Sequence, residues 1–202
     1  YHLAEVRGLK PSTRYWYTVA SGGANGSLNS FVTLPAPGGK LVFSLGLIGD
    51  AHISFGDSAT DAREKYFGKL SQYSGVLFEQ CVRDIKARNV DLAIILGDLS
   101  DSASERQYQG LSWTLLPAFG NIPYLACIGN HDKYLKNAGL GEQGFLKYVA
   151  NRSETRASFN IRGHQLILID SCVPDKNWGR IGEEQLSWVA QRLKEAAGQP
   201  SF

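Results

Sequence analysis

The chain has 202 residues, of which 43% are hydrophobic and 20% are charged, as in an ordinary globular protein with enough apolar side chains for a core. Its net charge of +2 is too small to indicate nucleic acid or an anionic membrane surface as a partner. The sequence has no apolar run of the roughly 18 residues that a membrane-spanning helix needs and no signal segment. Since no methionine occurs, we expect the natural chain to begin upstream of Tyr1.

Residues 1–34 have the pattern of β-structure. Alternating side chains from Leu9 to Val19 predict a strand, and Asn25-Gly26 is a hairpin signal before a returning strand at 31–34. An isolated β-meander is disfavoured because so few strands are only marginally stable alone. The segment is therefore interpreted as part of a larger β-module.

The pattern Leu-x-Pro-x-Thr-x-Tyr-x-Tyr-x-Val over residues 9–19 identifies that module by resemblance. It is similar to the final three strands of a fibronectin type III module, in which Tyr15 would occupy the tyrosine-corner position. The resemblance implies a fibronectin type III-like fragment at 1–34, whose earlier strands lie outside this sequence. Such a module favours a secreted or periplasmic protein.

A linker at 35–40 separates this segment from a region in which apolar strands alternate with helices. The alternation predicts an α/β domain over residues 41–202. Buried strands are predicted at 41–48, 91–96 and 122–128, helices at 75–88, 104–116 and 183–197, and a hairpin at 158–169.

Two of these helices carry an apolar stripe that we expect to face the core. In the helix at 75–88 the stripe consists of Leu77, Phe78, Cys81, Val82 and Ile85. In the helix at 183–197 it consists of Leu186, Val189, Ala190 and Leu193. The three cysteines lack the spacing of a zinc site and are expected to be buried thiols: Cys81, Cys127 and Cys172.

Polar residues follow each of the three predicted strands. Asp50 and His52 follow the first strand, Asp98 and Asp101 follow the second, and Gly-Asn-His-Asp at 129–132 follows the third. The carboxyl ends of parallel strands lie along one edge of a sheet, so these groups are expected to converge. Carboxylate, imidazole and amide oxygen ligands suit divalent manganese, iron or zinc. Asp101 is left between supporting a ligand and capping the next helix.

The three motifs Asp50-x-His52, Gly97-Asp98-x-x-Asp101 and Gly129-Asn130-His131-Asp132 resemble those of the calcineurin-like metallophosphoesterases. The resemblance covers residues 41–202. It implies a two-layered β-sandwich flanked by helices, with two divalent metal ions, iron, manganese or zinc, at one sheet edge.

The resemblance also implies a role for each residue. Asp50 and His52 would bind the first ion, Asp98 would bridge the two ions, and Asn130 would bind the second. The reaction would be in-line attack on phosphorus by a hydroxide held by the metals.

Two further residues of the third motif receive catalytic roles from the resemblance. His131 would lie outside the metal shell and assist the leaving group, and Asp132 would orient its imidazole. Tyr134 and Trp178 follow near strand ends and could stack on a substrate base, but packing or simple exposure is favoured for both.

Departures from the family pattern indicate which members of the family this chain resembles most. Purple acid phosphatases have a tyrosine where this chain has Asp101 and lack the histidine at position 52, yet a fibronectin-like segment is typical of them. The sequence Gly-Asp-Leu-Ser-Asp at 97–101 is closer to cyclic-nucleotide and glycerophosphodiester phosphodiesterases. The family has further histidine motifs that we expect after Phe202, because His164 precedes a predicted strand and is interpreted as a turn residue.

The sequence thus predicts a phosphodiesterase or phosphatase acting on a small phosphoester, with an undetermined oligomeric state. Two alternatives stay open: a nuclease of the same superfamily, and an extracellular binding module whose phosphoesterase-like domain has lost catalysis. Metal content and the continuation past Phe202 would separate them.

Overall fold

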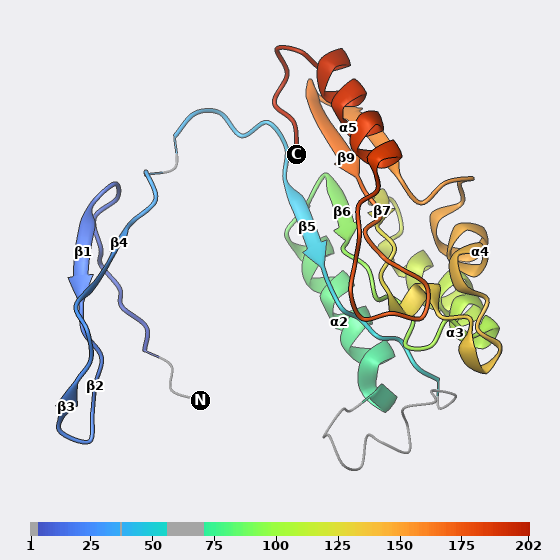
Figure 1. Ribbon diagram of the computed structural model, residues 1–202, viewed down its shortest axis with the longest axis horizontal. Coiled ribbons are helices and arrows are strands. Elements are labelled where there is room, and N and C mark those ends of the chain that lie inside the picture. The colour runs from blue at the N-terminus through green and yellow to red at the C-terminus, as the bar shows by residue number, and fades with distance from the viewer. Residues whose placement is uncertain (1–3, 37, 56–70) are drawn as a thin grey trace. The chain divides into compact units, whose positions relative to one another are not determined.

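The computed structural model describes residues 4–36, 38–55 and 71–202. The chain forms two compact units, Tyr1–Leu41 and Val42–Phe202 (Figure 1). Among the described residues, no helix combines the length and the apolarity needed to cross a membrane. The long connection at 54–74 that the sequence predicts lies partly outside the described residues.

The N-terminal unit consists of a β-hairpin ribbon. Strand β1 (Arg14–Tyr17) pairs antiparallel with β4 (Asn29–Val32), and β2 (Ala20–Ser21) pairs with β3 (Ala24–Asn25). The two-residue loop is Gly22-Gly23, with φ angles of 58° and 82°. The prediction of a turn at Asn25-Gly26 was wrong because glycine at both loop positions permits the positive φ angles that a tight hairpin turn needs.

Tyr15 makes both a hydrogen bond and an aromatic contact within this unit. Its hydroxyl accepts a hydrogen bond of 2.8 Å from the backbone N–H of Lys10, and its ring stacks on Phe31. No described residue of the unit is buried, and Trp16 and Leu34 are 63% and 84% exposed. The ribbon therefore has no hydrophobic core of its own.

The second unit is built on a parallel sheet in the order β5-β6-β7. Its strands are β5 (Leu45–Ile48), β6 (Leu92–Ile95) and β7 (Tyr124–Ala126), which are shorter than predicted. Ile48 lies opposite Ile95, and Ile95 lies opposite Ala126. The carboxyl ends of all three strands are therefore in register at one edge, as the sequence predicts.

The central strand β6 has apolar cover on both faces. Ala93 and Ile95 pack with the helices in the main core, whereas Leu92 and Ile94 pack with Leu166 of the second sheet. That sheet is the antiparallel hairpin of β8 (Ala157–Ile161) and β9 (His164–Leu168). The prediction of an α/β sandwich for this unit is thereby confirmed.

Helix α2 (Ser74–Ala87) covers one face of the parallel sheet (Figure 1). It buries Phe78, Val82 and Ile85, one residue per turn. Leu77 and Cys81 are exposed, so the apolar stripe is narrower than predicted and Cys81 is not the buried thiol that we expected. All three cysteines are free and none is fully buried.

The predicted helix at 104–116 changes geometry along its length. Helix α3 (Glu105–Gly110) begins after Ser104, whose side chain accepts the N–H of Gln107 as an N-cap. A π-helical turn at Leu111–Leu115 and a 3-10 turn at Leu116–Phe119 continue it. Since Ser104 is the cap, Asp101 is not.

Several short helical elements between His131 and Ala150 were not predicted from the sequence. Helix α4 (Gly141–Phe145) continues as a π-helical turn at Leu146–Ala150. Short 3-10 turns at His131–Lys133 and Lys136–Ala138 precede it. Helix α4 and its π-helical continuation place Phe145 and Val149 in the main core.

The half-buried face of helix α5 (Glu183–Glu195) differs from the predicted apolar stripe. Leu186 and Leu193 are each 46% exposed, whereas Trp188 is half-buried under the guanidinium of Arg156. Gln185 accepts the N–H and donates to the carbonyl of Asp170, which fixes the helix rotation. The apolar stripe was misread because these polar contacts determine which face is inward.

The structure places the β8–β9 turn, His164 and the last residues of the chain. The two-residue turn is Arg162-Gly163, and His164 is the first residue of β9, with its ring edge-on to Phe43. Residues 200–202 run parallel to β9 through hydrogen bonds with Gln165 and Ile167. His164 thus belongs to the hairpin and lies outside the strand-end loops.

Candidate metal centre

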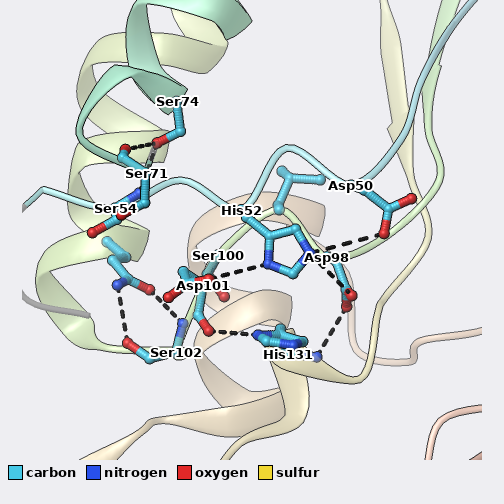
Figure 2. Close-up of polar contacts among 12 residues, drawn as sticks. Asp50, His52, Ser54, Ser71, Ser74, Asp98, Ser100, Asp101, Ser102 and His131 are labelled. Atoms are coloured by element: carbon cyan, nitrogen blue, oxygen red, sulfur yellow. Dashed lines mark hydrogen bonds and ion pairs between the residues drawn. The ribbon is translucent and has the colours of Figure 1, made fainter. Parts of the chain in front are cut away.

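The loops after β5 and β6 meet the loop after β7 at the carboxyl edge of the sheet (Figure 2). The Nε2 atom of His52 lies 3.6 Å from Oδ2 of Asp98 and 3.9 Å from Oδ1 of Asp50. The backbone N–H of His131 donates to Oδ1 of Asp98 over 2.9 Å. The rings of His52 and His131 have centroids 4.5 Å apart. Asp98 is therefore the central side chain of the cluster.

Three of the sequence-predicted residues form a group that fits a metal ion. Each of His52, Asp98 and His131 offers one donor atom, and these atoms all lie within 4.8 Å of one another. Imidazole nitrogen and carboxylate oxygen are suitable donors for zinc, manganese or iron. Asp50 lies at the outer side of this group with an 82% exposed side chain.

The backbone at this edge is strained in a way that small polar residues tolerate. Asp50, His52 and Asp98 have φ angles of 51°, 43° and 45°, in the left-handed region. Asp and His enter this region more readily than most residues, but each such residue costs about 1–3 kcal/mol. The loops are held there by backbone bonds from His52 to Asp98 and from Ile53 to Leu99, 2.8 Å and 2.7 Å long.

Gly129 lets the second and third loops approach backbone to backbone. A Cβ atom at Gly129 would overlap the backbone nitrogen and Oδ1 of Asp98, and one at Gly97 would lie 3.0 Å from the Cα of Gly129. Only glycine fits at both positions, so the glycines in these motifs set the distance between the Asp98 and His131 loops.

We expect Gly129→Ala to displace Asp98 from His131 and to lower the free energy of unfolding by roughly 1–3 kcal/mol through overpacking. Chemical denaturation of the metal-free protein would measure this loss. Gly75→Ala is the matched control, because a Cβ there meets no atom within 4 Å. Equal stability of the two variants would contradict the close approach.

Asp101 holds both histidines. It is fully buried, and its Oδ1 lies 3.2 Å from Nδ1 of His52 while its backbone carbonyl lies 2.6 Å from Nδ1 of His131. A carbonyl oxygen only accepts, so Nδ1 of His131 carries the hydrogen and Nε2 is the reactive nitrogen. A carboxylate behind an imidazole is the usual support of a metal-binding histidine. The geometry therefore favours the supporting role for Asp101.

Asp132 does not orient His131, and that part of the prediction was wrong. Its Oδ1 accepts from the backbone N–H and hydroxyl of Ser100, and its Oδ2 accepts from the N–H groups of Leu99 and Gly129, at 2.7–3.2 Å. Burial raises the pKa of Asp132 to about 6, although these four donors lower it. Asp132 instead fastens the third loop to the second.

We expect Asp132→Asn to lower the free energy of unfolding by about 1–3 kcal/mol. In either orientation, the NH2 group of the Asn side chain would face a backbone N–H that now donates to the carboxylate. That N–H and the NH2 group would then both be buried donors without an acceptor. Urea denaturation at pH 8 would measure the loss. Asp175→Asn is the control, since Asp175 accepts its bonds at an exposed loop. A neutral effect at Asp132 would show that the four bonds do not hold the loops.

His131 is half-buried, and its neighbours affect its pKa in opposite directions. The pKa of His131 is lowered, chiefly by burial and also by the neighbouring His52, although the Asp101 carbonyl and the carboxylates of Asp98 and Asp101 act in the opposite direction. Asn130 precedes it, half-buried, at the start of the 3-10 turn. The metal roles of Asp50, His52, Asp98 and Asn130 and the catalytic role of His131 stay predictions.

Sequence reasoning missed the residues that support these loops. The buried side chain of Ser100 binds Asp132, and the hydroxyl of Tyr108 donates to the Asp132 carbonyl over 2.7 Å. Lys133 is nearly buried and pairs with Asp170 at 2.6 Å. A serine within a motif and a lysine after it carry no signal in one sequence, because both are common surface residues.

Comparisons with known proteins identify the family of this chain. A family model described as calcineurin-like phosphoesterase matches residues 43–187. Two relatives named probable cyclic nucleotide phosphodiesterase, from a Psychrobacter and a Synechococcus species, are 30% and 32% identical over 57% and 55% of this chain. The matches cover 35% and 40% of those two proteins.

A solved structure shows the same fold. The crystal structure of a dimetal phosphatase from Danio rerio matches with a TM-score of 0.54 at 14% identity, over 77% of this chain and 66% of that one. Since the family model covers well over half of the residues and the three motifs lie at one sheet edge, the chain belongs to the calcineurin-like phosphoesterase family.

Proposed function

We propose that this chain carries the catalytic site of a metal-dependent phosphoester hydrolase, a phosphodiesterase or phosphatase. The observation that carries the proposal is the convergence of His52, Asp98 and His131, whose donor atoms lie within 4.8 Å of one another on three separate loops. Half-buried imidazole and carboxylate donors that converge in this way suit a metal ion. The family and the relatives' names support the reaction class.

Two divalent ions, of iron, manganese or zinc, fit the donor set. Asp50 and His52 would hold the first ion, Asp98 would contribute to both, and Asn130 would hold the second. When bound, such ions withdraw charge from phosphoryl oxygens and activate water. The chain's contribution is to fix the donors: Asp101 sets the His52 tautomer so that Nε2 faces Asp98 and Asp50.

His131 would act on the leaving group. Because its Nδ1 hydrogen is engaged by the Asp101 carbonyl, a proton on Nε2 is the one available for transfer. In the protonated state this nitrogen would donate to the departing ester oxygen as the bond to phosphorus breaks, which stabilises the developing charge. The pKa of His131 is lowered, chiefly by burial, and the nearby carboxylate charges of Asp98 and Asp101 offset only part of that shift.

The substrate would be a small phosphoester, and a diester is favoured. The Gly-Asp-Leu-Ser-Asp motif at 97–101 and two relatives named as phosphodiesterases support it. A nuclease is disfavoured by the near-neutral net charge of +2. A binding module without catalysis is disfavoured by the complete support of both histidines from Asp101.

The full-length protein should hydrolyse bis(p-nitrophenyl) phosphate faster than p-nitrophenyl phosphate, and only with Mn²⁺, Zn²⁺ or Fe²⁺ present. Metal analysis after purification and a titration with chelator would accompany the rates. If the protein binds metal but hydrolyses the monoester faster, the proposed activity becomes that of a phosphatase and not of a phosphodiesterase. Absence of both bound metal and turnover would favour the binding module.

We propose further that residues 1–34 are a fibronectin type III-like fragment, followed by a linker at 35–40 and the catalytic domain at 41–202. The bond from Lys10 to the Tyr15 hydroxyl has the form of a tyrosine corner, and the exposed apolar side chains suit missing sandwich strands. Such a module supports a secreted or periplasmic location. Fractionation of the source cells would reject that location if the protein stayed with cytoplasmic markers.

A further inference from the structure

A cavity of about 330 Å³ opens beside the candidate metal centre. Among the described residues, one wall comes from the end of β5 and the loop that follows it, at residues 48–52. The other wall comes from α2 and the 3-10 turn Ser71–Tyr73 before it, and it consists of Ser71, Ser74, Leu77, Phe78 and Cys81. The cavity therefore lies between α2 and the loop that carries Asp50 and His52.

The walls of this cavity are largely apolar. Ile48 and Phe78 belong to the main core and are only 7% and 2% exposed, so they form a rigid base. Leu77 is 60% exposed and Cys81 is exposed as well, although both belong to the apolar stripe that the sequence assigned to the core. Both side chains line the cavity instead. Walls of this kind favour an apolar occupant, whose binding removes apolar surface from water.

The cavity offers few polar groups to an occupant. The hydroxyl of Ser74 donates its single hydrogen to the carbonyl of Ser71 over 2.7 Å and accepts the N–H of Ser54 over 3.0 Å (Figure 2). None of the described residues that line the cavity is a lysine or an arginine. A sugar or a second anionic group would therefore lose hydrogen bonds to water that these walls do not replace.

The cavity and the metal centre share two residues. Asp50 and His52 line the cavity, and the Nε2 atom of His52 lies 3.6 Å from Oδ2 of Asp98 within the donor group. His131, which would assist the leaving group, is not among the described residues that line the cavity. A phosphodiester held at the centre would thus have its leaving arm at His131 and its other arm beside the cavity.

We propose that this cavity is the subsite for the ester arm that stays on phosphorus, and that it selects diesters in which this arm is an alkyl or aryl group. The inference rests on the proposed function and names a substrate class for it. An apolar cavity of roughly 150 Å³ is large enough to hold a benzene ring. The volume of about 330 Å³ therefore admits one ring or a branched alkyl chain.

Two diesters with the same leaving group test this subsite: cyclohexyl p-nitrophenyl phosphate and methyl p-nitrophenyl phosphate. The full-length protein should hydrolyse the cyclohexyl ester with a kcat/KM about 10-fold or more above that of the methyl ester, as added methylene groups do in an apolar pocket. Leu77→Gln puts a polar side chain in the wall and should lower this ratio by about 5-fold or more. Cys81→Trp fills the cavity with an indole ring and should bring the two rates close together.

Matched variants on the same helix supply the controls. Val76→Gln adds the same polar side chain at an exposed residue that does not line the cavity, and Cys81→Ser leaves the cavity open, so both should keep a ratio close to the parent's. Equal rates for the two esters in the parent, or a cyclohexyl preference that survives Leu77→Gln and Cys81→Trp, would overturn the subsite while the proposed function stands. A parent protein that hydrolyses neither ester would refute the proposed function, and the subsite with it.

Discussion

Replacement of Asp98 by Asn should reduce metal-dependent diester hydrolysis by about 1,000-fold or more, a loss of roughly 4 kcal/mol of transition-state stabilisation. The substitution keeps the shape of the side chain. An Asn oxygen can still accept the N–H of His131, but its nitrogen would occupy the position of Oδ2, which now lies 3.6 Å from His52. An amide nitrogen has no lone pair for a metal, and the negative charge shared by the site is lost.

The measurement is turnover of bis(p-nitrophenyl) phosphate by full-length protein, with metal content determined on the same samples. Asp84→Asn provides the control, because it removes one carboxylate from the exposed side of α2. The expected result is fewer bound ions and almost no turnover for Asp98→Asn alone. Asn130→Ala should also abolish turnover. Parent-like rates in Asp98→Asn would reject the site assignment as a whole.

Replacement of His131 by Ala should leave the metal ions bound and lower turnover by about 100- to 10,000-fold, the range of a lost general acid. The loss should be greatest for poor leaving groups. A p-nitrophenolate departs with little help, whereas an alkoxide needs a proton as its bond to phosphorus breaks. The His131 backbone N–H, which binds Asp98, is unaffected by the change.

A series of diesters with leaving groups of increasing basicity would measure this dependence. His164→Ala is the control, since His164 lies on the β8–β9 hairpin and packs against Phe43. An equal loss for every leaving group would count against the acid role. Loss of bound metal would instead make His131 a ligand, which its place within the 4.8 Å donor group allows.

Residues far apart in the sequence could be assigned to one site because strand ends are predictable. Short apolar runs indicated β5, β6 and β7, and each run ends before a glycine and a polar group. Parallel pairing brings the carboxyl ends of such strands to one edge. That rule was enough to place His52, Asp98 and His131 together.

The partners of these residues could not be predicted in the same way. Adjacency in the sequence suggested that Asp132 would orient His131, but the Asp132 carboxylate turns back to four donors on the second and third loops. Asp101, thirty residues earlier, supplies the contact through its backbone carbonyl. A backbone carbonyl is present at every residue, so no sequence pattern marks the one that is used.

The inward face of α5, outside the site, could not be predicted from the sequence either. Its best apolar stripe includes Leu186 and Leu193, yet each of them is 46% exposed. The rotation is set by Gln185 against the backbone of Asp170 and by Arg156 over Trp188. Periodicity counts apolar residues, whereas packing also satisfies polar groups of a neighbouring element.

The sequence by itself determined the α/β class, the order of the strands and the chemical type of each candidate ligand, because these follow from local patterns. Only the tertiary structure decided which groups hold those ligands: Asp101 behind both histidines, Asp132 between the loops and the Tyr134 ring beside His131. The physical reason is that hydrogen bonds between loops depend on backbone placement to within a few tenths of an ångström, which local propensity does not determine.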